Sequence, residues 1–228
     1  MRHAVILSSY NRPTMVQQAI ASVREQGAPH QLIVTDDGSD PATLRAIEAA
    51  LDGDPDARLL VSTRARVGLG ALRDPTLRAV RCINDALALV DADFVHYLPD
   101  DDWYAPGRFE AFEEWFARHP PPHHSVAYGR LHYRDARGKH LGELYQGHIL
   151  VRPACLVDHG QFCHRAACLR AVPEWPAEPA NFAFDATFMT ALAGAGWPFF
   201  PVDRIVSYKR VHGKNLQRIR DLDIGRRD

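Results

Sequence analysis

The sequence predicts an α/β fold with a mainly parallel sheet. Apolar runs of strand length alternate with segments of helical periodicity through the first half, which favours parallel strands joined by right-handed crossovers. Three of these runs end abruptly in polar or acidic residues, as expected of strands that deliver side chains to one edge of a sheet. Hydrophobic residues make up 46% of the 228 residues, so a sizeable core can form.

The first half is expected to contain four strands with helices between them. Pro13 stands near the start of the first helix, where its missing N–H does no harm. Each helix has apolar residues at helical spacing. The expected strands cover residues 3–7, 32–34, 58–62 and 94–98, and the helices cover about 15–23, 44–51 and 77–90.

The second half is less regular. Aromatic residues at helical spacing predict a helix that ends at His119-Pro120, and the Ala-Arg-Gly-Lys turn at 136–139 predicts a hairpin. The other expected elements are strands at 125–128, 131–135 and 141–145, a helix at about 185–192 and a strand region at 198–208. Residues 218–228 form a highly charged tail that we expect to fray.

Charge and hydropathy exclude several classes of function. A formal net charge of −1 gives no general attraction to nucleic acid or to an anionic membrane. No apolar run approaches the roughly 18 residues of a membrane-spanning helix, and the run that follows Met1 is too short for a secretory signal peptide. We therefore expect a cytoplasmic protein with no transmembrane segment and no nucleic-acid partner.

The cysteines admit two interpretations. Cys155, Cys163 and Cys168 lie close to His159 and His164, and such a group could hold a zinc ion. No Cys-x-x-Cys pair occurs, and a chain of this length needs no disulfides. Buried free cysteines are therefore the favoured interpretation.

The most informative stretch is LPDDDW at 98–103, where an apolar strand runs into three adjacent aspartates. Three neighbouring carboxylates repel one another, and a divalent cation is the usual compensation. Because Mg²⁺ takes only one or two protein carboxylates and otherwise water and phosphates, the cluster suggests a metal-bridged phosphorylated ligand. The plainer interpretation is a solvated turn in which Asp102 caps the next helix.

Two other strands end in similar side chains. Residues 34–40 read VTDDGSD, with paired carboxylates at Asp36 and Asp37, and the first strand ends in SSYNR at 8–12. Ligands of open α/β sheets bind outside the carboxyl ends of the strands. The three endings together therefore predict one site at one edge of the sheet.

The ordered set of strand-end motifs resembles the signatures of family-2 glycosyltransferases, most nearly those of the spore-coat polysaccharide glycosyltransferase of that family. The motifs that carry this resemblance are SSYNRP at 8–13, VTDDGSD at 34–40, LPDDDW at 98–103, ALRDPTLR at 71–78, DHGQFCHR at 158–165 and FDAT at 184–187. The resemblance extends from the first strand to about residue 210 and implies the GT-A fold. It implies a single domain at 1–217, in which a Rossmann-like nucleotide-binding half at about 1–103 merges with an acceptor-binding half at about 104–217.

The resemblance also implies how a donor is bound. Asp37 would accept the N3–H of uracil or thymine, a proton that cytosine lacks, while Tyr10 packs against the base with Ser8 nearby. Arg73 would lie beside the base or the diphosphate. The implied donor is a UDP- or dTDP-sugar.

At the acidic strand end, the resemblance implies that Asp100 binds the ribose hydroxyls and that Asp101 ligates the Mg²⁺ or Mn²⁺ bridging the diphosphate. Asp102 is the alternative metal ligand, because three consecutive aspartates leave the register open. His212, in the basic segment 208–215, could reach the diphosphate or the metal. A solvated basic loop is the other interpretation of that segment.

For catalysis, Asp185 matches the general base of the family, which implies inversion at the anomeric carbon. An acceptor hydroxyl must lose its proton to a positioned base, and Asp185 follows apolar residues at the start of an expected helix. Asp185 could instead only cap its helix. Asp158 is the second candidate for the base.

These roles predict a metal-dependent glycosyltransferase, as in polysaccharide biosynthesis, that acts on a hydroxyl of a glycan, a lipid-linked sugar or a small molecule. An Asp-dependent phosphohydrolase is one alternative, although its nucleophile and acid need a residue between them and Asp36 and Asp37 are adjacent. A non-catalytic nucleotide-sugar-binding protein is the other alternative.

Overall fold

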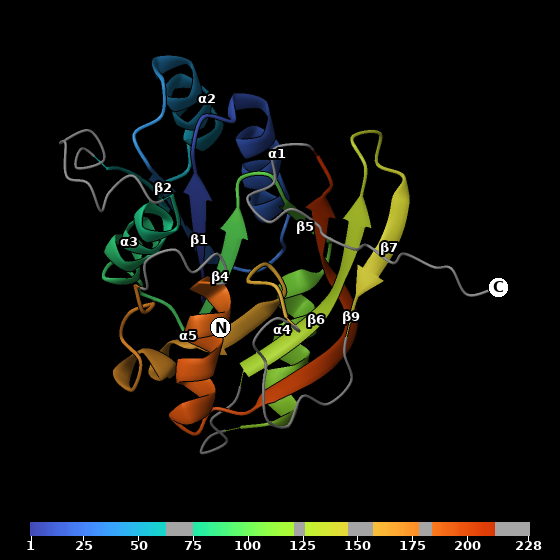
Figure 1. Cartoon of the computed structure of the whole chain (residues 1–228). Coiled ribbons are helices and arrows are strands. Elements are labelled where there is room, and N and C mark those ends of the chain that lie inside the picture. The colour runs from blue at the N-terminus through green and yellow to red at the C-terminus, as the bar shows by residue number, and fades with distance from the viewer. Residues whose placement is uncertain (63–74, 121–125, 146–156, 178–183, 213–228) are drawn as a thin grey trace.

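The computed structural model describes residues 1–62, 75–120, 126–145, 157–177 and 184–212 (Figure 1). Its strands are β1 (His3–Ser9), β2 (His30–Asp36), β3 (Ala57–Val61), β4 (Phe94–Pro99), β5 (Trp103–Tyr104), β6 (Val126–Arg134), β7 (His140–Leu144), β8 (Phe162–Arg165) and β9 (Phe199–Arg210). Its helices are α1 (Pro13–Arg24), α2 (Pro41–Leu51), α3 (Pro75–Leu87), α4 (Arg108–Arg118) and α5 (Phe184–Gly194), with a short 3₁₀-helix at Ala166–Arg170.

The described strands form one curled sheet in the order β3-β2-β1-β4-β8-β6-β9-β5, and β7 pairs with the outer part of β6 (Figure 1). β3, β2, β1 and β4 are all parallel, so their carboxyl ends lie at the same edge. Ser8 lies between Thr35 and Pro99 in the register of this edge. The predicted parallel half is confirmed, with the carboxyl ends of its strands at one edge.

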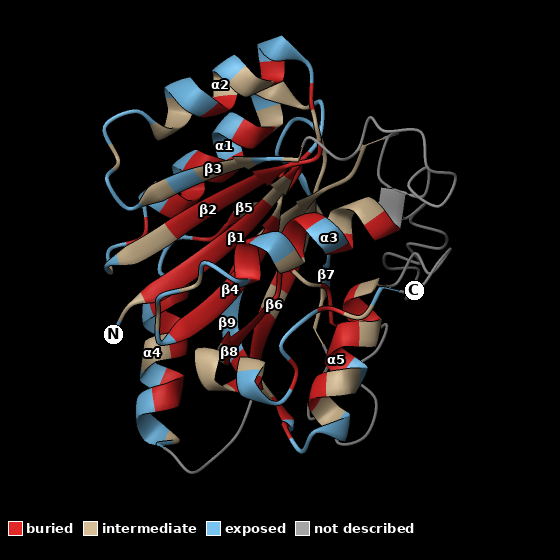
Figure 2. Cartoon of the chain, turned by 90° about the vertical axis from the view of Figure 1, so that its left-hand side faces the viewer, coloured by how far each residue is buried: buried red, intermediate tan, exposed pale blue. Residues whose placement is uncertain are grey.

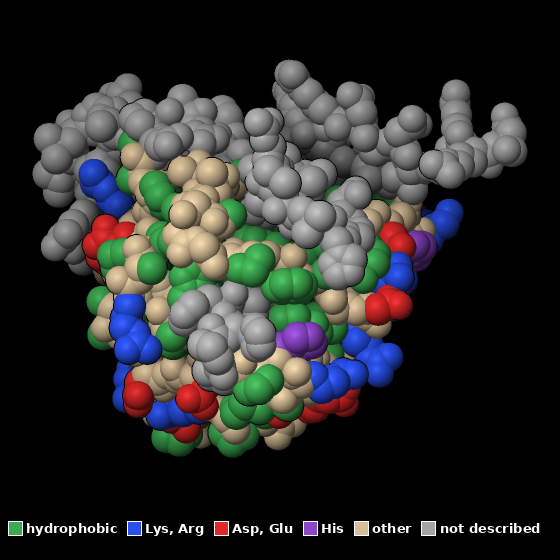
Figure 3. All heavy atoms as spheres, turned by 90° about the horizontal axis from the view of Figure 1, so that it is seen from below, with side chains coloured by type: hydrophobic (Ala, Val, Ile, Leu, Met, Phe, Trp, Pro, Cys, Tyr) green, Lys and Arg blue, Asp and Glu red, His purple; other side chains and the backbone are tan. Residues whose placement is uncertain are grey.

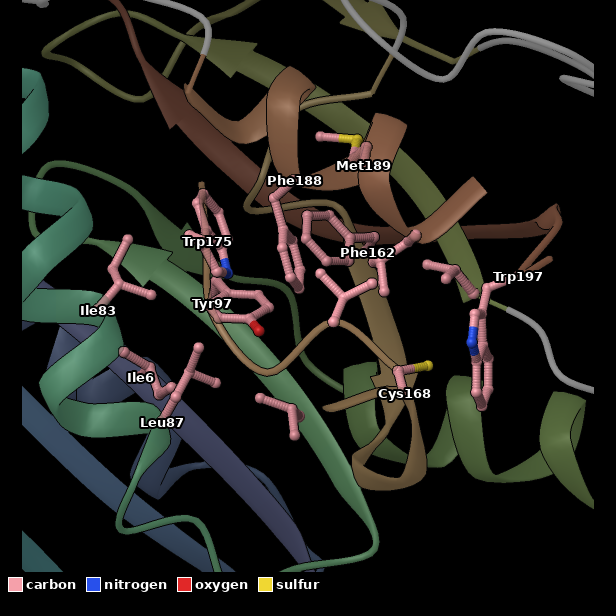
Figure 4. Close-up of a cluster of buried hydrophobic side chains, with 14 of the residues drawn as sticks. Ile6, Ile83, Leu87, Tyr97, Phe162, Cys168, Trp175, Phe188, Met189 and Trp197 are labelled. Atoms are coloured by element: carbon pink, nitrogen blue, oxygen red, sulfur yellow. The ribbon is translucent and has the colours of Figure 1, made fainter. Parts of the chain in front are cut away.

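Helices cover both faces of the parallel half. Val5 and Leu7 of β1 pack with α1 and α2, whereas Ile6 packs with α3 and α5. Because both of their faces are buried, β1, β2 and β4 read as continuous apolar runs, whereas the edge strand β3 is partly exposed. Figure 2 shows the buried strands between helices whose outer residues are exposed. In Figure 4, Ile6 lies beside Ile83 and Leu87 of α3 within this core.

The second half is mixed and differs from the prediction in its strands. The two strands expected at 125–128 and 131–135 are one strand, β6. Its pairing with β9 shifts register between Tyr128 and Leu131, and β6 continues through these shifts. β8 was not expected, and it lies antiparallel between β4 and β6. β5 follows the acidic cluster directly and α4 begins only at Arg108, so Asp102 does not cap a helix.

Gly129 allows β6 and β9 to approach each other closely. A Cβ atom at this position would lie 2.3 Å from Cγ1 of Val206 and 2.9 Å from the carbonyl oxygen of Arg204. A side chain there would push β9 away from β6. This contact matters because β9 carries Lys209 toward the functional edge.

The described cysteines Cys82, Cys163 and Cys168 are buried free thiols, as predicted. Cys155 of the zinc alternative lies outside the described residues, and the described part holds no group of three or more His, Cys, Asp or Glu side chains suited to a metal. None of the described helices is long and apolar enough to cross a membrane. On the face in Figure 3, basic and acidic side chains lie together along the margins, so its visible part carries no patch of one sign.

Candidate active site

A cavity of about 570 Å³ opens at the carboxyl edge of the parallel strands. Its walls come from the ends of β1, β2 and β4, the first turns of α1, α3 and α5, the turn before β8 and the residues that end β9. Most of the predicted site residues line it, namely Ser8, Tyr10, Asp37, Asp100, Asp101, Asp185 and His212. Asp102 is not among the lining residues, and Arg73 lies outside the described residues.

The two adjacent acids at the end of β2 have different surroundings. Asp36 is fully buried, and its carboxylate accepts hydrogen bonds from the Ser39 backbone N (2.7 Å) and Oγ (2.6 Å). Gly38, in the turn between Asp36 and Ser39, has a φ of 77°, a backbone conformation that favours glycine. Asp36 therefore holds the turn, while Asp37 faces the cavity.

Asp37 forms an ion pair with Arg78 of α3, whose Nε lies 2.7 Å from Asp37 Oδ2. The Arg78 guanidinium also lies 5.3 Å from the ring centroid of Tyr10. Burial raises the pKa of Asp37, and the cation opposes this rise. Sequence reasoning missed Arg78, although it ends the same motif that contains Arg73; its position in the first turns of α3 is what aims it at the sheet edge.

Asn11 joins the end of β1 to the end of β2. Its φ of 51° lies in the left-handed region, which Asn tolerates better than most residues. Its backbone N donates to Ser39 Oγ (2.8 Å), and its Oδ1 accepts from the backbone N of Asp40 (2.8 Å). The motif SSYNRP therefore needs Asn to fix two strand ends together.

Asp100 is held by the end of β1. Its Oδ2 accepts from the backbone N of Tyr10 (2.8 Å), and its Oδ1 accepts from Nη1 of Arg12 (2.6 Å). Burial raises the pKa of Asp100 to about 6, against the opposing effect of Arg12. Arg12 was assigned no role from its sequence position, yet its Nη2 also lies 3.4 Å from Oδ2 of Asp101.

Asp101 and Asp102 point to different partners. Oδ2 of Asp101 lies 3.0 Å from Nε2 of His212 at the cavity. Oδ1 of Asp102 accepts from the backbone N of Arg210 (3.0 Å), and its buried Oδ2 has no hydrogen-bond partner within the described residues. Burial raises the pKa of Asp102 well above its ordinary value, although Lys209 opposes this. The geometry thus favours Asp101 as the metal ligand.

The donor set at Asp101 fits a divalent cation. A carboxylate oxygen and an imidazole nitrogen are ligands that Mn²⁺ accepts, and Mg²⁺ needs only one or two carboxylates beside phosphates and water. Asp101 and His212 would hold the cation, with its remaining positions open to a diphosphate. Arg12 lies beside the same carboxylate and neutralises part of its charge.

The far end of the cavity holds a second acidic group. Asp158 pairs with Nζ of Lys209, and its Oδ1 accepts from the backbone N of Gly160 (3.0 Å). Burial alone would raise the pKa of Asp158, but the Lys209 ammonium outweighs it and lowers the pKa to about 2. The pKa of Lys209 is raised in turn, because Asp158 and Asp102 outweigh its own burial.

Asp185 is the second residue of α5, so the first turn of that helix places it. It is 6% exposed, its Oδ1 accepts from the backbone N of Ala186 (2.8 Å), and its Oδ2 lies 3.8 Å from Nδ1 of His159. Apolar residues of α5, including Phe188 and Met189, anchor the helix in the core shown in Figure 4. The helix therefore presents a fixed carboxylate to the cavity.

A parallel nucleotide-type half-sheet that continues into a mixed half-sheet, with an acidic strand end at the junction, defines the GT-A class of glycosyltransferase folds. The chain belongs to glycosyl transferase family 2, whose sequence model matches residues 4–147. The predicted fold and family are thereby confirmed. Membership of this family also speaks against the phosphohydrolase alternative.

Among curated proteins, the chain is similar to Protein CgeD of Bacillus subtilis (strain 168), with 26% identity over 211 residues. The match covers 89% of this chain and 48% of CgeD, so the chain spans about half the length of that relative.

Two solved structures share the fold. TarS 1–349 of S. aureus in complex with UDP has a TM-score of 0.70 and 18% identity, covering 92% of this chain and 61% of that one. The mannosyltransferase PcManGT of Pyrobaculum calidifontis in complex with GDP-Man and Mn²⁺ has a TM-score of 0.66 and 16% identity, covering 94% and 58%.

Proposed function

We propose that this chain transfers a sugar from a pyrimidine nucleoside diphosphate to a hydroxyl acceptor, with inversion and with the help of a divalent cation. The observation that carries the proposal is one cavity that contains a base-type hydrogen-bond acceptor, Asp37, the acidic strand end at Asp100 and Asp101, and a separate buried carboxylate, Asp185. Solved proteins of the same fold carry UDP, or GDP-Man with Mn²⁺, which supports a nucleotide-sugar donor.

The pyrimidine preference rests on the acceptor character of Asp37. An ionised carboxylate accepts the N3–H of uracil or thymine, whereas N3 of cytosine has no proton to donate. Tyr10 is 44% exposed beside it and offers an aromatic face for stacking. Arg78 can turn its guanidinium from Asp37 to a carbonyl oxygen of the base, which keeps its charge paired with an acceptor.

Asp185 is better suited than Asp158 to take the acceptor proton. Lys209 holds the pKa of Asp158 at about 2, so that carboxylate is a weak base. A general base works best when its pKa lies near the operating pH. The carboxylate of Asp185 bonds only to the neighbouring backbone N and approaches His159, among the contacts seen in the described residues.

The charges along the cavity match the expected bond breaking. The sugar passes through an oxocarbenium-like state while the diphosphate leaves. A bound cation would neutralise the charge that develops on the leaving diphosphate. Arg12 and Lys209 line the same cavity and would add positive charge near the diphosphate, while Asp100, also in the lining, would accept from the ribose hydroxyls.

A paired binding and transfer assay tests this function. UDP-, dTDP-, CDP- and GDP-sugars would be tried with and without Mn²⁺ or Mg²⁺, first by thermal shift and then by release of nucleoside diphosphate in the presence of a panel of hydroxyl acceptors. A ligand at 100 times its Kd stabilises the folded state by about 2.7 kcal/mol, which is readily seen. Donor binding without transfer to any acceptor would favour the non-catalytic alternative, and phosphomonoester hydrolysis would restore the phosphohydrolase.

A further inference from the structure

Arg108, the first residue of α4, is a fully buried cation without an ion-pair partner among the described residues. Its guanidinium lies 4.0 Å from the ring centroid of Tyr104 and 5.1 Å from that of Phe112. Burying a charge is costly unless its hydrogen bonds are satisfied. The groups that Arg108 bonds therefore show what the cation does here.

The guanidinium donates instead to three backbone carbonyls from two separate segments. Nη1 donates to the carbonyl oxygens of Gly160 (2.6 Å) and Val206 (3.2 Å), and Nη2 donates to that of Phe162 (3.0 Å). Gly160 and Phe162 belong to the turn and strand around β8, whereas Val206 belongs to β9. The planar fork of one arginine thus fixes the spacing between two strands.

The fourth hydrogen bond of the guanidinium, made by Nε, begins a chain of bonds that runs away from the cavity. Nε of Arg108 donates to Nδ1 of His96 (3.3 Å), so Nε2 of His96 carries the proton and donates to Nδ1 of His3 (2.8 Å). Nε2 of His3 then donates to Oε1 of Glu113 (3.1 Å). Two neutral imidazoles therefore connect the buried cation to a carboxylate near the surface and fix its orientation.

Both clamped segments carry residues of the end of the cavity that contains Asp158, Asp185 and Lys209, which we call the catalytic end. Asp158 and His159 immediately precede Gly160, and Lys209 follows Val206 by three residues on β9. Asp158 and Lys209 pair across the gap between the two segments. The residues expected to hold the nucleoside lie at the carboxyl ends of β1, β2 and β4. Among these strands Arg108 bonds only to His96, inside β4, and not to the carboxyl ends.

We propose that Arg108 is a positioning residue: it sets the distance between the Asp158 turn and β9, and so places the catalytic end of the cavity without contacting the part that is expected to hold the nucleoside. This proposal rests on the proposed transferase function. One buried clamp would then hold Asp158 and Lys209 at their present separation. Loss of the clamp should therefore lower kcat while leaving the affinity for uridine nearly unchanged. Uridine is the suitable probe because the diphosphate of UDP would also reach Asp101 and His212, which β9 supports.

The test compares Arg108→Met and Arg108→Lys with the wild type and with Arg130→Met. Arg130 lies on β6 and forms surface ion pairs with Glu143 and Asp203, so its variant should behave as wild type. Calorimetry with uridine would count binding-competent sites and give Kd. Transfer kinetics would then give kcat per uridine-binding site, and amide hydrogen exchange would be followed over 157–165, 204–212 and the β1–β2 region.

For Arg108→Met we expect at least a tenfold lower kcat per uridine-binding site, a uridine Kd within about threefold of wild type, and lost exchange protection only at 157–165 and 204–212. Arg108→Lys should recover part of kcat, because an ammonium can still donate to carbonyls but lacks the fork. A wild-type kcat per site in Arg108→Met, or equal losses in kcat and uridine affinity, would overturn the proposal. Should the Met variant not fold, Arg108→Lys is judged by the same two criteria.

A wild-type chain that transfers no sugar would contradict the proposed function rather than the clamp. The exchange measurement then decides alone: protection lost only at 157–165 and 204–212 supports positioning, and uniform or absent loss contradicts it.

Discussion

Nε2 of His212 lies 3.0 Å from Oδ2 of Asp101, so the end of the described chain meets the acidic end of β4. The two residues are far apart in sequence, and β9 brings them together by running antiparallel to β5. A neutral imidazole beside a carboxylate can ligate a metal, and protonation of that imidazole would instead make an ion pair. Asp101 and His212 can therefore lie side by side both when a cation is bound and when none is bound.

Replacing Asp101 by alanine should remove the dependence of UDP binding on Mn²⁺ or Mg²⁺. Uridine binding should survive, because Asp37 and Tyr10 are untouched and no phosphate is involved. Titrations of UDP and uridine with and without metal would measure both effects.

Asp102→Ala serves as the contrast. Because Asp102 accepts from the Arg210 backbone and is buried away from the cavity lining, we expect lower stability and retained metal dependence. Metal dependence unchanged in both single variants would remove the acidic cluster from the metal site.

Asp37 is expected to select the base. UDP or dTDP should stabilise the protein in a thermal-shift measurement, and CDP should give little shift. Asp37→Asn should weaken UDP about 10- to 100-fold, since a hydrogen bond to a charged group contributes about 1.5–3 kcal/mol. A larger shift with a guanine or adenine nucleotide than with UDP would contradict the assignment.

The buried histidine His164 should make the fold sensitive to acid. Nδ1 of His164 donates to the Arg165 carbonyl (2.8 Å), so Nε2 accepts from the Tyr97 hydroxyl (2.8 Å) and the ring is neutral. Burial lowers the pKa of His164 to about 4, below the ordinary 6.5. A lowered histidine pKa stabilises the fold above pH 6.5, and that contribution is lost as pH falls toward 4.

At pH 5 this histidine alone should lower the free energy of unfolding by about 2 kcal/mol relative to pH 7.5. Denaturant titrations at the two pH values would measure the loss. His164→Gln, which can bond to both partners without titrating, should show a correspondingly smaller loss. An equal loss in the variant would assign the effect to other groups.

The fold was predictable where local pattern decides it. β1, β2 and β4 are buried on both faces, so each is a continuous apolar run with a polar end, and the helices between the strands imply their parallel pairing. β8 escaped prediction because Phe162–Arg165 is short, and its place between β4 and β6 is set by pairing with distant strands.

The site was predictable as an edge of the sheet and less so at single residues. Asp36 and Asp37 look alike in sequence, yet Asp36, the last residue of β2, bonds within its own turn and Asp37, one residue beyond the strand, lines the cavity. Asp101 and Asp102 differ in the same way. Arg12, Arg78 and Arg108 escaped assignment because their partners are distant carboxylates and carbonyls.

Asp185→Asn separates catalysis from binding. The substitution keeps the size of the side chain and an oxygen that accepts from Ala186, but it removes the basic carboxylate. If Asp185 is the general base, turnover should fall by about 10²- to 10⁴-fold. Donor affinity should barely change, because Asp37, Asp100 and Asp101 hold the donor.

The measurement pairs the acceptor-dependent transfer rate with the donor Kd on one preparation. Asp203→Asn, on the surface of β9 beside Arg130, is the matched control and should keep the wild-type rate. If Asp185 only caps its helix, the variant should also transfer at the wild-type rate, since Asn caps as well as Asp. That result would move the search to Asp158, whose low pKa would then require Lys209 to release it before it could accept a proton.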